Sequence, residues 1–126
     1  SHLIPQETKP KFQVKRWESL SDGVCDAAVA VMLENRRPEN LRDPAWIAKQ
    51  MAKVGCGLQL LNDDLGDSEF CVADRFSLAD IALGCLLGYL NLRFADLDIA
   101  KNYPNLNRHY NVMMARVSFQ ETAPPV

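Results

Sequence analysis

One stretch of this sequence is apolar nearly all round a helix and begins with a strong helix-start signal. Ser77 and Asp80 form the S-x-x-D pattern of a capping box, in which the serine caps the first turn and the aspartate bonds back to the serine N–H. The run that follows, residues 81–92, carries no charge and is too short to cross a bilayer, which needs roughly 20 apolar residues. A helix without a polar face is expected to be buried on every side. The sequence therefore predicts that this helix is the centre of an all-helical domain.

Further helices are predicted on both sides of this stretch. The first begins near Lys11 and ends close to Pro38, which cannot continue a helix. The second begins with Asp43 as N-cap and Pro44 at the first helical position, and it ends near Gly66. Apolar residues recur along it at steps of three and four, which predicts a packing seam. The residues of this seam are Ile47, Met51, Val54, Leu58, Leu61 and Leu65.

The last long helix is predicted from Pro104 to about Arg116. A second capping pattern, Ser118 with Glu121, predicts a short final turn. No segment shows the period-2 alternation of a strand, and 126 residues suit a single domain. The expected fold class is therefore all-α, an antiparallel bundle of four to five helices.

Charge and cysteine content narrow the possible functions. A net charge of -2 and a pI near 5.6 give no field that would hold nucleic acid or an anionic membrane, so neither partner is expected. The four cysteines show no C-x-x-C spacing, and neither histidine stands at metal-ligand spacing from a cysteine, so no metal is expected. The polar start shows no signal-peptide pattern, and free thiols fit a cytoplasmic protein.

Two acidic residues on the first helix are the main site candidates from the residues themselves. Asp22 and Asp26 are four apart, so both carboxylates project from one side of the helix. The alternatives are a solvated face or pairing with Lys15 or Arg16. Like charges at this spacing destabilise a helix by a few tenths of a kcal/mol. This cost is small enough to be compatible with either a structural role or a ligand-binding role.

Three segments together resemble the C-terminal domain of cytosolic glutathione transferases, most closely the bacterial members. They are DGVCDAAVAVMLENRRP in the first helix, ADRFSLADIALGCLLGYL around the capped helix, and YPNLNRHYNVMMARVSFQET near the end. The likeness covers essentially the whole chain; one departure is Ala73, where the family usually has glycine. It implies that residues 11–126 are the helical domain and residues 1–10 an inter-domain linker. An N-terminal thioredoxin-like domain, which holds the thiolate-activating residue, would then be missing from this chain.

The resemblance also implies roles for particular residues. Asp22 to Asp26 resembles the D-G-V-x-D stretch of pi-class enzymes, so Asp26, and more weakly Asp22, would bind the γ-glutamyl ammonium of glutathione held by the partner subunit of a homodimer. Met32 and Arg36 correspond to positions that line the hydrophobic pocket for a small electrophilic substrate; the alternatives are core packing for Met32 and solvation for Arg36. Ser77 and Asp80 are interpreted as a structural capping box. The catalytic residue is expected in the missing domain, so none is assigned here.

Three functions follow as hypotheses. The first is that the full-length parent conjugates glutathione, its co-substrate, to small electrophiles, whereas this fragment is inactive alone. The second is a non-catalytic interaction module, because similar helical domains occur in transcription- and translation-associated assemblies. The third is a thiol enzyme that uses one of the four cysteines, although no histidine is placed by sequence as its helper.

Overall fold

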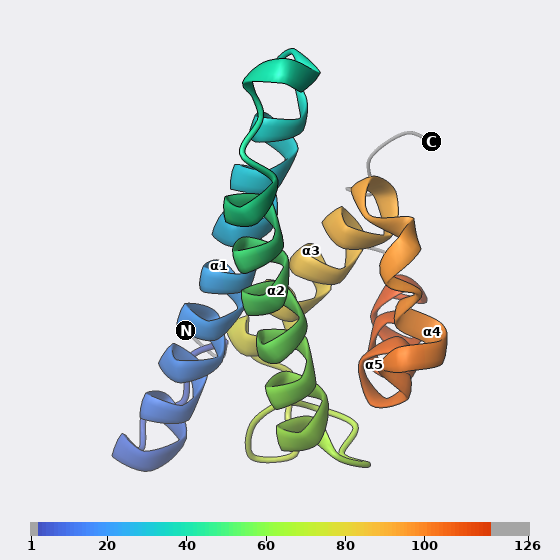
Figure 1. Ribbon diagram of the computed structural model, residues 1–126. Coiled ribbons are helices and arrows are strands. Elements are labelled where there is room, and N and C mark those ends of the chain that lie inside the picture. Colours follow the sequence, from blue (N-terminus) through green and yellow to red (C-terminus); the bar gives the residue numbers. More distant parts are fainter. Residues whose placement is uncertain (1–2, 117–126) are drawn as a thin grey trace.

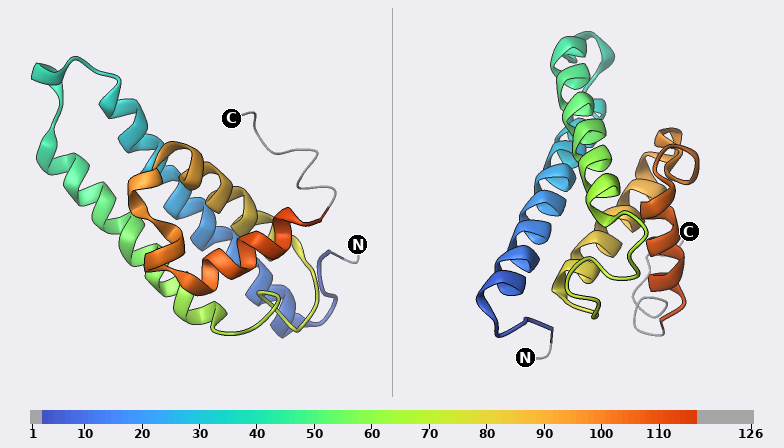
Figure 2. Two further views of the ribbon diagram at one scale, coloured as in Figure 1. Left: turned by 90° about the vertical axis from the view of Figure 1, so that its right-hand side faces the viewer. Right: turned by 90° about the horizontal axis from the view of Figure 1, so that it is seen from below.

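The computed structural model describes residues 3–116, and within them the chain is all-helical. Figure 1 shows a long hairpin of α1 (Thr8–Asn35) and α2 (Pro44–Leu65) with α3 (Leu78–Arg93) packed beside it. The short α4 (Ile99–Asn102) leads into α5 (Pro104–Met114), which lies against α2 and α3. The long helices run alternately up and down, as both views of Figure 2 show. The predicted all-α fold is therefore confirmed, with five α-helices in the described part.

Local sequence signals set both ends of α2, whereas the start of α1 differs from the prediction. The Asp43 carboxylate accepts from the Trp46 N–H at 3.1 Å and caps α2, and Gly66, at φ 55°, ends that helix in a conformation that favours glycine. At α1 the prediction was three residues late, because the helix already begins at Thr8. Pro10 lies in its first turn, where a missing N–H breaks no helical hydrogen bond.

The close approach of α1 and α2 depends on a glycine. A Cβ built on Gly57 would overlap Cγ2 of Val24, so only a residue without a side chain fits there. Helices α1 and α2 are thus in close contact at Gly57. Four residues of the α2 seam are fully buried, whereas Ile47 and Met51 are half-buried towards the far end of the hairpin. The four are Val54, Leu58, Leu61 and Leu65.

The prediction that the helix starting at Leu78 is buried on every side is wrong for one face. Leu83, Leu87 and Leu90 are completely buried against α1 and α5. On the opposite face Cys85 and Arg93 are exposed, and Leu92 is 42% exposed. Within residues 3–116 two helices cover α3, and two helices cannot enclose the full circumference of a third. An apolar helix with an open face is a feature that the periodicity did not indicate.

The end of the chain also differs from expectation. The predicted polar turn after α3 contains a 3₁₀ turn and α4, which Asp98 caps from a left-handed backbone conformation (φ 47°) through the Lys101 N–H. Helix α5 ends at Met114, two residues before the predicted end. The predicted capping pair Ser118 and Glu121 lies outside the described residues.

No single helix in residues 3–116 has the length and apolar character needed to cross a bilayer. The one combination that meets the criterion joins α3 to the segment Ala95–Asn102, with a bend of 104° between them.

Candidate functional site

The most concentrated polar cluster lies at the N-terminus of α3 and is closed to solvent. The Asp80 carboxylate accepts from the Ser77 N–H (2.9 Å), the Cys71 N–H (2.9 Å) and Nε2 of His109 (2.8 Å). The Ser77 hydroxyl accepts from the Ala79 N–H at 3.2 Å, which completes the capping box. The side chains of Asp80 and His109 are fully buried. The donors that bond to the Asp80 carboxylate all lie inside the protein. The cluster therefore holds the start of α3 and the loop before it in place.

Hydrogen bonding decides the charge state of Asp80. Burial raises the pKa of this carboxyl group, but the hydrogen bonds from His109, Cys71 and Ser77 outweigh burial and hold the pKa below its usual range. Because an ionised carboxylate only accepts, we assign the proton to Nε2 of His109. The other ring nitrogen, Nδ1, is buried and has no hydrogen-bond partner within residues 3–116.

Sequence spacing missed that the fold brings Cys71 and His109 together. They are 38 residues apart in the chain, and Sγ lies 3.9 Å from Nε2. With Asp80 they form a group of three possible metal ligands. Burial and the neighbouring Asp80 carboxylate raise the pKa of the Cys71 thiol far above its usual value, so the free thiolate needed for nucleophilic catalysis is strongly disfavoured. The geometry therefore gives the thiol-enzyme hypothesis no activated nucleophile here.

The accessible candidate site is the open face where α1 and α3 lie side by side. On α1, residues at steps of three and four present one stripe that contains Asp22, Cys25, Met32 and Arg36. On α3 the corresponding stripe contains Cys85, Tyr89 and Arg93. We call these seven residues the α1–α3 face. It combines two thiols, a phenol and charges of both signs on a partly apolar surface.

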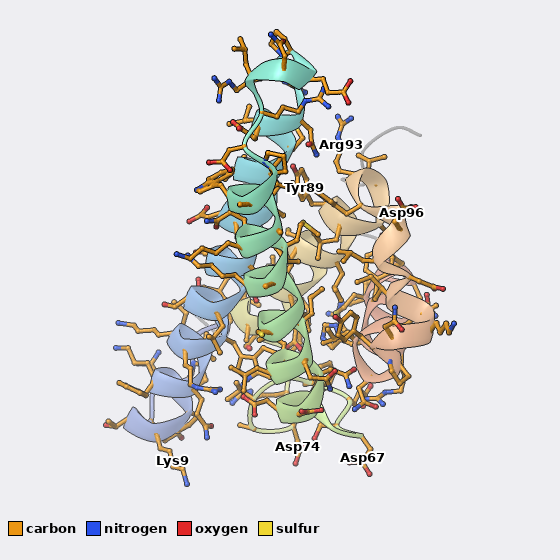
Figure 3. The ribbon with its side chains drawn as sticks, viewed as in Figure 1. Lys9, Asp67, Asp74, Tyr89, Arg93 and Asp96 are labelled. Carbon is orange, nitrogen blue, oxygen red and sulfur yellow. The ribbon has the colours of Figure 1, made fainter. Side chains whose placement is uncertain are left out.

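Tyr89 is the residue of this face that sequence reasoning missed. Its hydroxyl oxygen is buried, yet it has no hydrogen-bond partner among the residues that the structure describes. Burial and then Cys25 raise the pKa of the phenol, while Arg93 and Arg36 act in the opposite direction. The ring packs on Phe94, with centroids 6.2 Å apart and planes tilted by 53°. In Figure 3 Tyr89 and Arg93 extend from neighbouring turns of α3 near its C-terminal end. The signal available in the sequence was a single tyrosine within the uncharged run of residues 81–92.

The predicted acidic pair lies on the solvent side of α1. Asp22 and Asp26 are exposed, and neither forms an ion pair within residues 3–116. The alternative of pairing with Arg16 is wrong, because Arg16 bonds instead to Asp64 at 2.7 Å. Burial and then the two carboxylates raise the pKa of Cys25, so this thiol is not activated either. Both aspartates are thus available to a ligand or to another chain.

The predicted pocket residues occupy different settings. Met32 is half-buried and Arg36 is exposed as the C-cap of α1. A hollow of about 550 Å³ opens between the ends of α1, α2 and α3, and neither Met32 nor Arg36 is among the residues that line it. This hollow could not be predicted from the sequence, because its walls come from segments that are distant in the chain. Its lining includes Val31, Ile47, Met51, Leu92, Arg93 and Phe94.

Comparisons of this chain with known proteins all point to one family. Residues 44–111 match the family described as glutathione S-transferase, C-terminal domain. A glutathione S-transferase from Methylobacillus flagellatus KT, solved with glutathione bound, is 55% identical and superposes with a TM-score of 0.96 over 99% of this chain and 62% of its own. One from Methylobacterium radiotolerans JCM 2831, in complex with glutathione sulfonate, is 40% identical with a TM-score of 0.94, over 98% of this chain and 58% of its own.

This chain is also similar to a curated protein. The uncharacterized GST-like protein YibF of Escherichia coli K12 is 29% identical over 123 residues, which is 98% of this chain and 60% of that protein. The chain therefore spans about 60% of the length of the relatives that it matches.

Proposed function

The chain belongs to the glutathione S-transferase family, whose C-terminal domain it forms, and on that premise we propose that the whole protein transfers glutathione to small electrophiles. The observation that carries the proposal is the 55% identity and 0.96 TM-score to a transferase solved with glutathione bound. We place the thiolate-activating residue in an N-terminal thioredoxin-like domain of the whole protein. Residues 1–10 are then the connection to that domain and residues 11–126 the helical domain. The protein would act in the cytoplasm and would need no metal.

The reaction balances without any further reactant. With an aryl halide, the glutathione thiolate forms a C–S bond at the ring carbon that carries the halogen. The halide leaves with the electron pair of the broken bond, and the thiol proton passes to solvent. In this scheme Met32 and Arg36 line the pocket for the electrophile, where a flexible, polarizable methionine suits varied apolar substrates.

Asp26 supplies the proposed contact to glutathione across a homodimer. A carboxylate without an internal partner can accept a charge-assisted hydrogen bond from the γ-glutamyl ammonium held by the other subunit, with Asp22 one turn away as a weaker contributor. The α1–α2 hairpin is the proposed dimer surface. Trp46 and Leu60 support this assignment, since both are large apolar residues exposed on α2.

The test uses the full-length protein. Glutathione binding is measured by calorimetry, and conjugation is followed with 1-chloro-2,4-dinitrobenzene. We expect Asp26→Asn to weaken glutathione binding by about tenfold, whereas Asp67→Asn, an exposed loop substitution, leaves it unchanged. The fragment alone should show no conjugation. Failure of the full-length protein to bind glutathione would overturn the proposal and favour the non-catalytic interaction module.

A further inference from the structure

The first turn of α3 has one backbone donor that its capping box does not satisfy. The start of an α-helix leaves four N–H groups without a partner inside the helix. At α3 the Ser77 N–H bonds to the Asp80 carboxylate at 2.9 Å, and the Ala79 N–H bonds to the Ser77 hydroxyl at 3.2 Å. The Asp80 N–H bonds to the Ser77 carbonyl oxygen at 3.0 Å. The capping box therefore accounts for three of the four donors.

The fourth donor is the N–H of Leu78, and it bonds to the carbonyl oxygen of Leu3 at 3.0 Å. Leu3 belongs to the segment before α1, and Figure 2 shows this segment near the loop that leads into α3. The first turn of α3 is thus completed by a residue from the start of the described chain.

The segment that carries Leu3 is packed against the helical domain. Residues 3–7 precede α1 and are not helical. Within this segment Pro5 is buried, and Leu3 and Ile4 are half-buried. The proline ring also fixes one backbone dihedral angle, which limits the freedom of the segment. One backbone hydrogen bond and one buried ring therefore hold the segment in place.

We propose that the Leu78 N–H positions the connection between the two domains of the whole protein, and through it the glutathione thiolate relative to the electrophile. This inference rests on the proposed transferase function, in which residues 1–10 lead to the N-terminal domain. Leu78 is then a positioning residue that acts through the Leu3 carbonyl group. The rate of a reaction between two bound molecules depends steeply on their alignment, so a loosened connection lowers the rate of transfer even when both are bound.

Leu78→Pro removes this donor without breaking a hydrogen bond within the helix, because Leu78 is the first helical residue. Pro44 and Pro104 already occupy the first positions of α2 and α5. Ser77, which would precede the new proline, has the extended backbone that a following proline favours (φ −148°, ψ 179°). Leu78→Ala is the matched comparison, because it also loses the leucine side chain but keeps the N–H.

Both variants are compared in the full-length protein. Saturating glutathione removes any effect of weaker glutathione binding, and kcat/KM is measured for 1-chloro-2,4-dinitrobenzene. We expect Leu78→Pro to lower this kcat/KM by about fivefold relative to Leu78→Ala. Thermolysin, which cleaves before large apolar residues, should cut at Leu3 and Ile4 about fivefold faster in Leu78→Pro, as read by mass spectrometry. A contact with a merely structural role would change the urea midpoint but neither of these rates in the folded protein.

Either an equal kcat/KM or an equal cleavage rate in the two variants would overturn the positioning role while the transferase function stands. If the wild-type protein conjugates no glutathione, although circular dichroism shows that it is folded, the transferase function fails and this inference with it. If Leu78→Pro does not fold, Pro5→Gly decides, because it loosens the same segment without altering α3. Pro5→Gly should lower kcat/KM by about threefold or more. A wild-type value in Pro5→Gly would overturn the proposal.

Discussion

Asp80→Asn is the substitution that tests most directly how the fold is held together. Three donors, the N–H groups of Cys71 and Ser77 and Nε2 of His109, lie 2.8–2.9 Å from the carboxylate oxygens. An asparagine keeps one acceptor oxygen but turns an NH₂ group towards buried donors. Hydrogen bonds to a charged group contribute about 1.5–3 kcal/mol each, and breaking a buried charged pair typically costs 3–5 kcal/mol. We therefore expect the free energy of unfolding to fall by about 3–5 kcal/mol.

Urea denaturation of the chain, followed by far-ultraviolet circular dichroism, measures this loss. With a slope of about 2 kcal/mol per molar urea, the midpoint should fall by about 2 M. Asp67→Asn, in the exposed loop before α3, is the control and should shift the midpoint by less than about 0.3 M. A loss below about 1 kcal/mol for Asp80→Asn would refute the view that this carboxylate organises the start of α3.

The same contacts predict a pH dependence with a definite sign. The pKa of Asp80 is lowered in the folded chain, so the ionised form is stabilised relative to the unfolded state. Its contribution is complete above the unfolded pKa of about 4 and is lost as the pH falls through the folded pKa. Wild-type stability should thus decline below about pH 4, and the decline should be shallower in Asp80→Asn. Parallel pH profiles for the two proteins would contradict the assignment.

Three further substitutions and one labelling experiment probe other features. Ala73 has a positive φ of 54°, a backbone conformation that favours glycine. Ala73→Gly should therefore raise the free energy of unfolding, measured by urea titration, by about 0.5–1 kcal/mol. A lower free energy of unfolding would contradict this argument. Gly57→Ala should lower it by about 1–3 kcal/mol because the new methyl group collides with α1, whereas Gly23→Ala, which meets open space in a helix, should raise it by about 0.5–1 kcal/mol. Iodoacetamide at neutral pH, read by mass spectrometry, should label exposed Cys56 well before Cys71, whose thiol pKa is raised by burial; equal rates would show that Cys71 is accessible.

Helix boundaries could be predicted where a local signal fixes them. Asp43 with Pro44 marks the start of α2, and Ser77 with Asp80 marks the start of α3, because capping involves residues that are three apart in the chain. The pairing of Cys71 with His109 could not be predicted, since it depends on how α5 returns to the start of α3. Sequence spacing identifies metal-ligand or catalytic residues that lie in the same turn or loop. It does not identify residues that only the fold brings together.

The open face of α3 escaped prediction for a related reason. Periodicity reports which residues are apolar, and in a helix that is apolar all round it cannot say which side lacks a neighbour. The prediction of a helix buried on every side therefore included Tyr89, although this residue is half-buried and lies on the same side of α3 as the exposed Cys85 and Arg93. The acidic pair on α1 was easier to find, because two carboxylates one turn apart are visible in the sequence alone.

The arrangement separates what stabilises α3 from what α3 presents to a ligand. Asp80 fixes the first turn through donors from the preceding loop and from α5, while Arg93 stands thirteen residues later, about 20 Å along the same helix. The buried leucines between them hold the helix rigidly against α1, so the positions of Tyr89 and Arg93 relative to Arg36 are set by packing rather than by contacts among themselves. Charged groups that are placed by a packed helix need no partner of their own to stay in position. Substitutions at Arg36 or Arg93, whose side chains are exposed, should therefore leave the free energy of unfolding nearly unchanged, in contrast to the loss expected at Asp80.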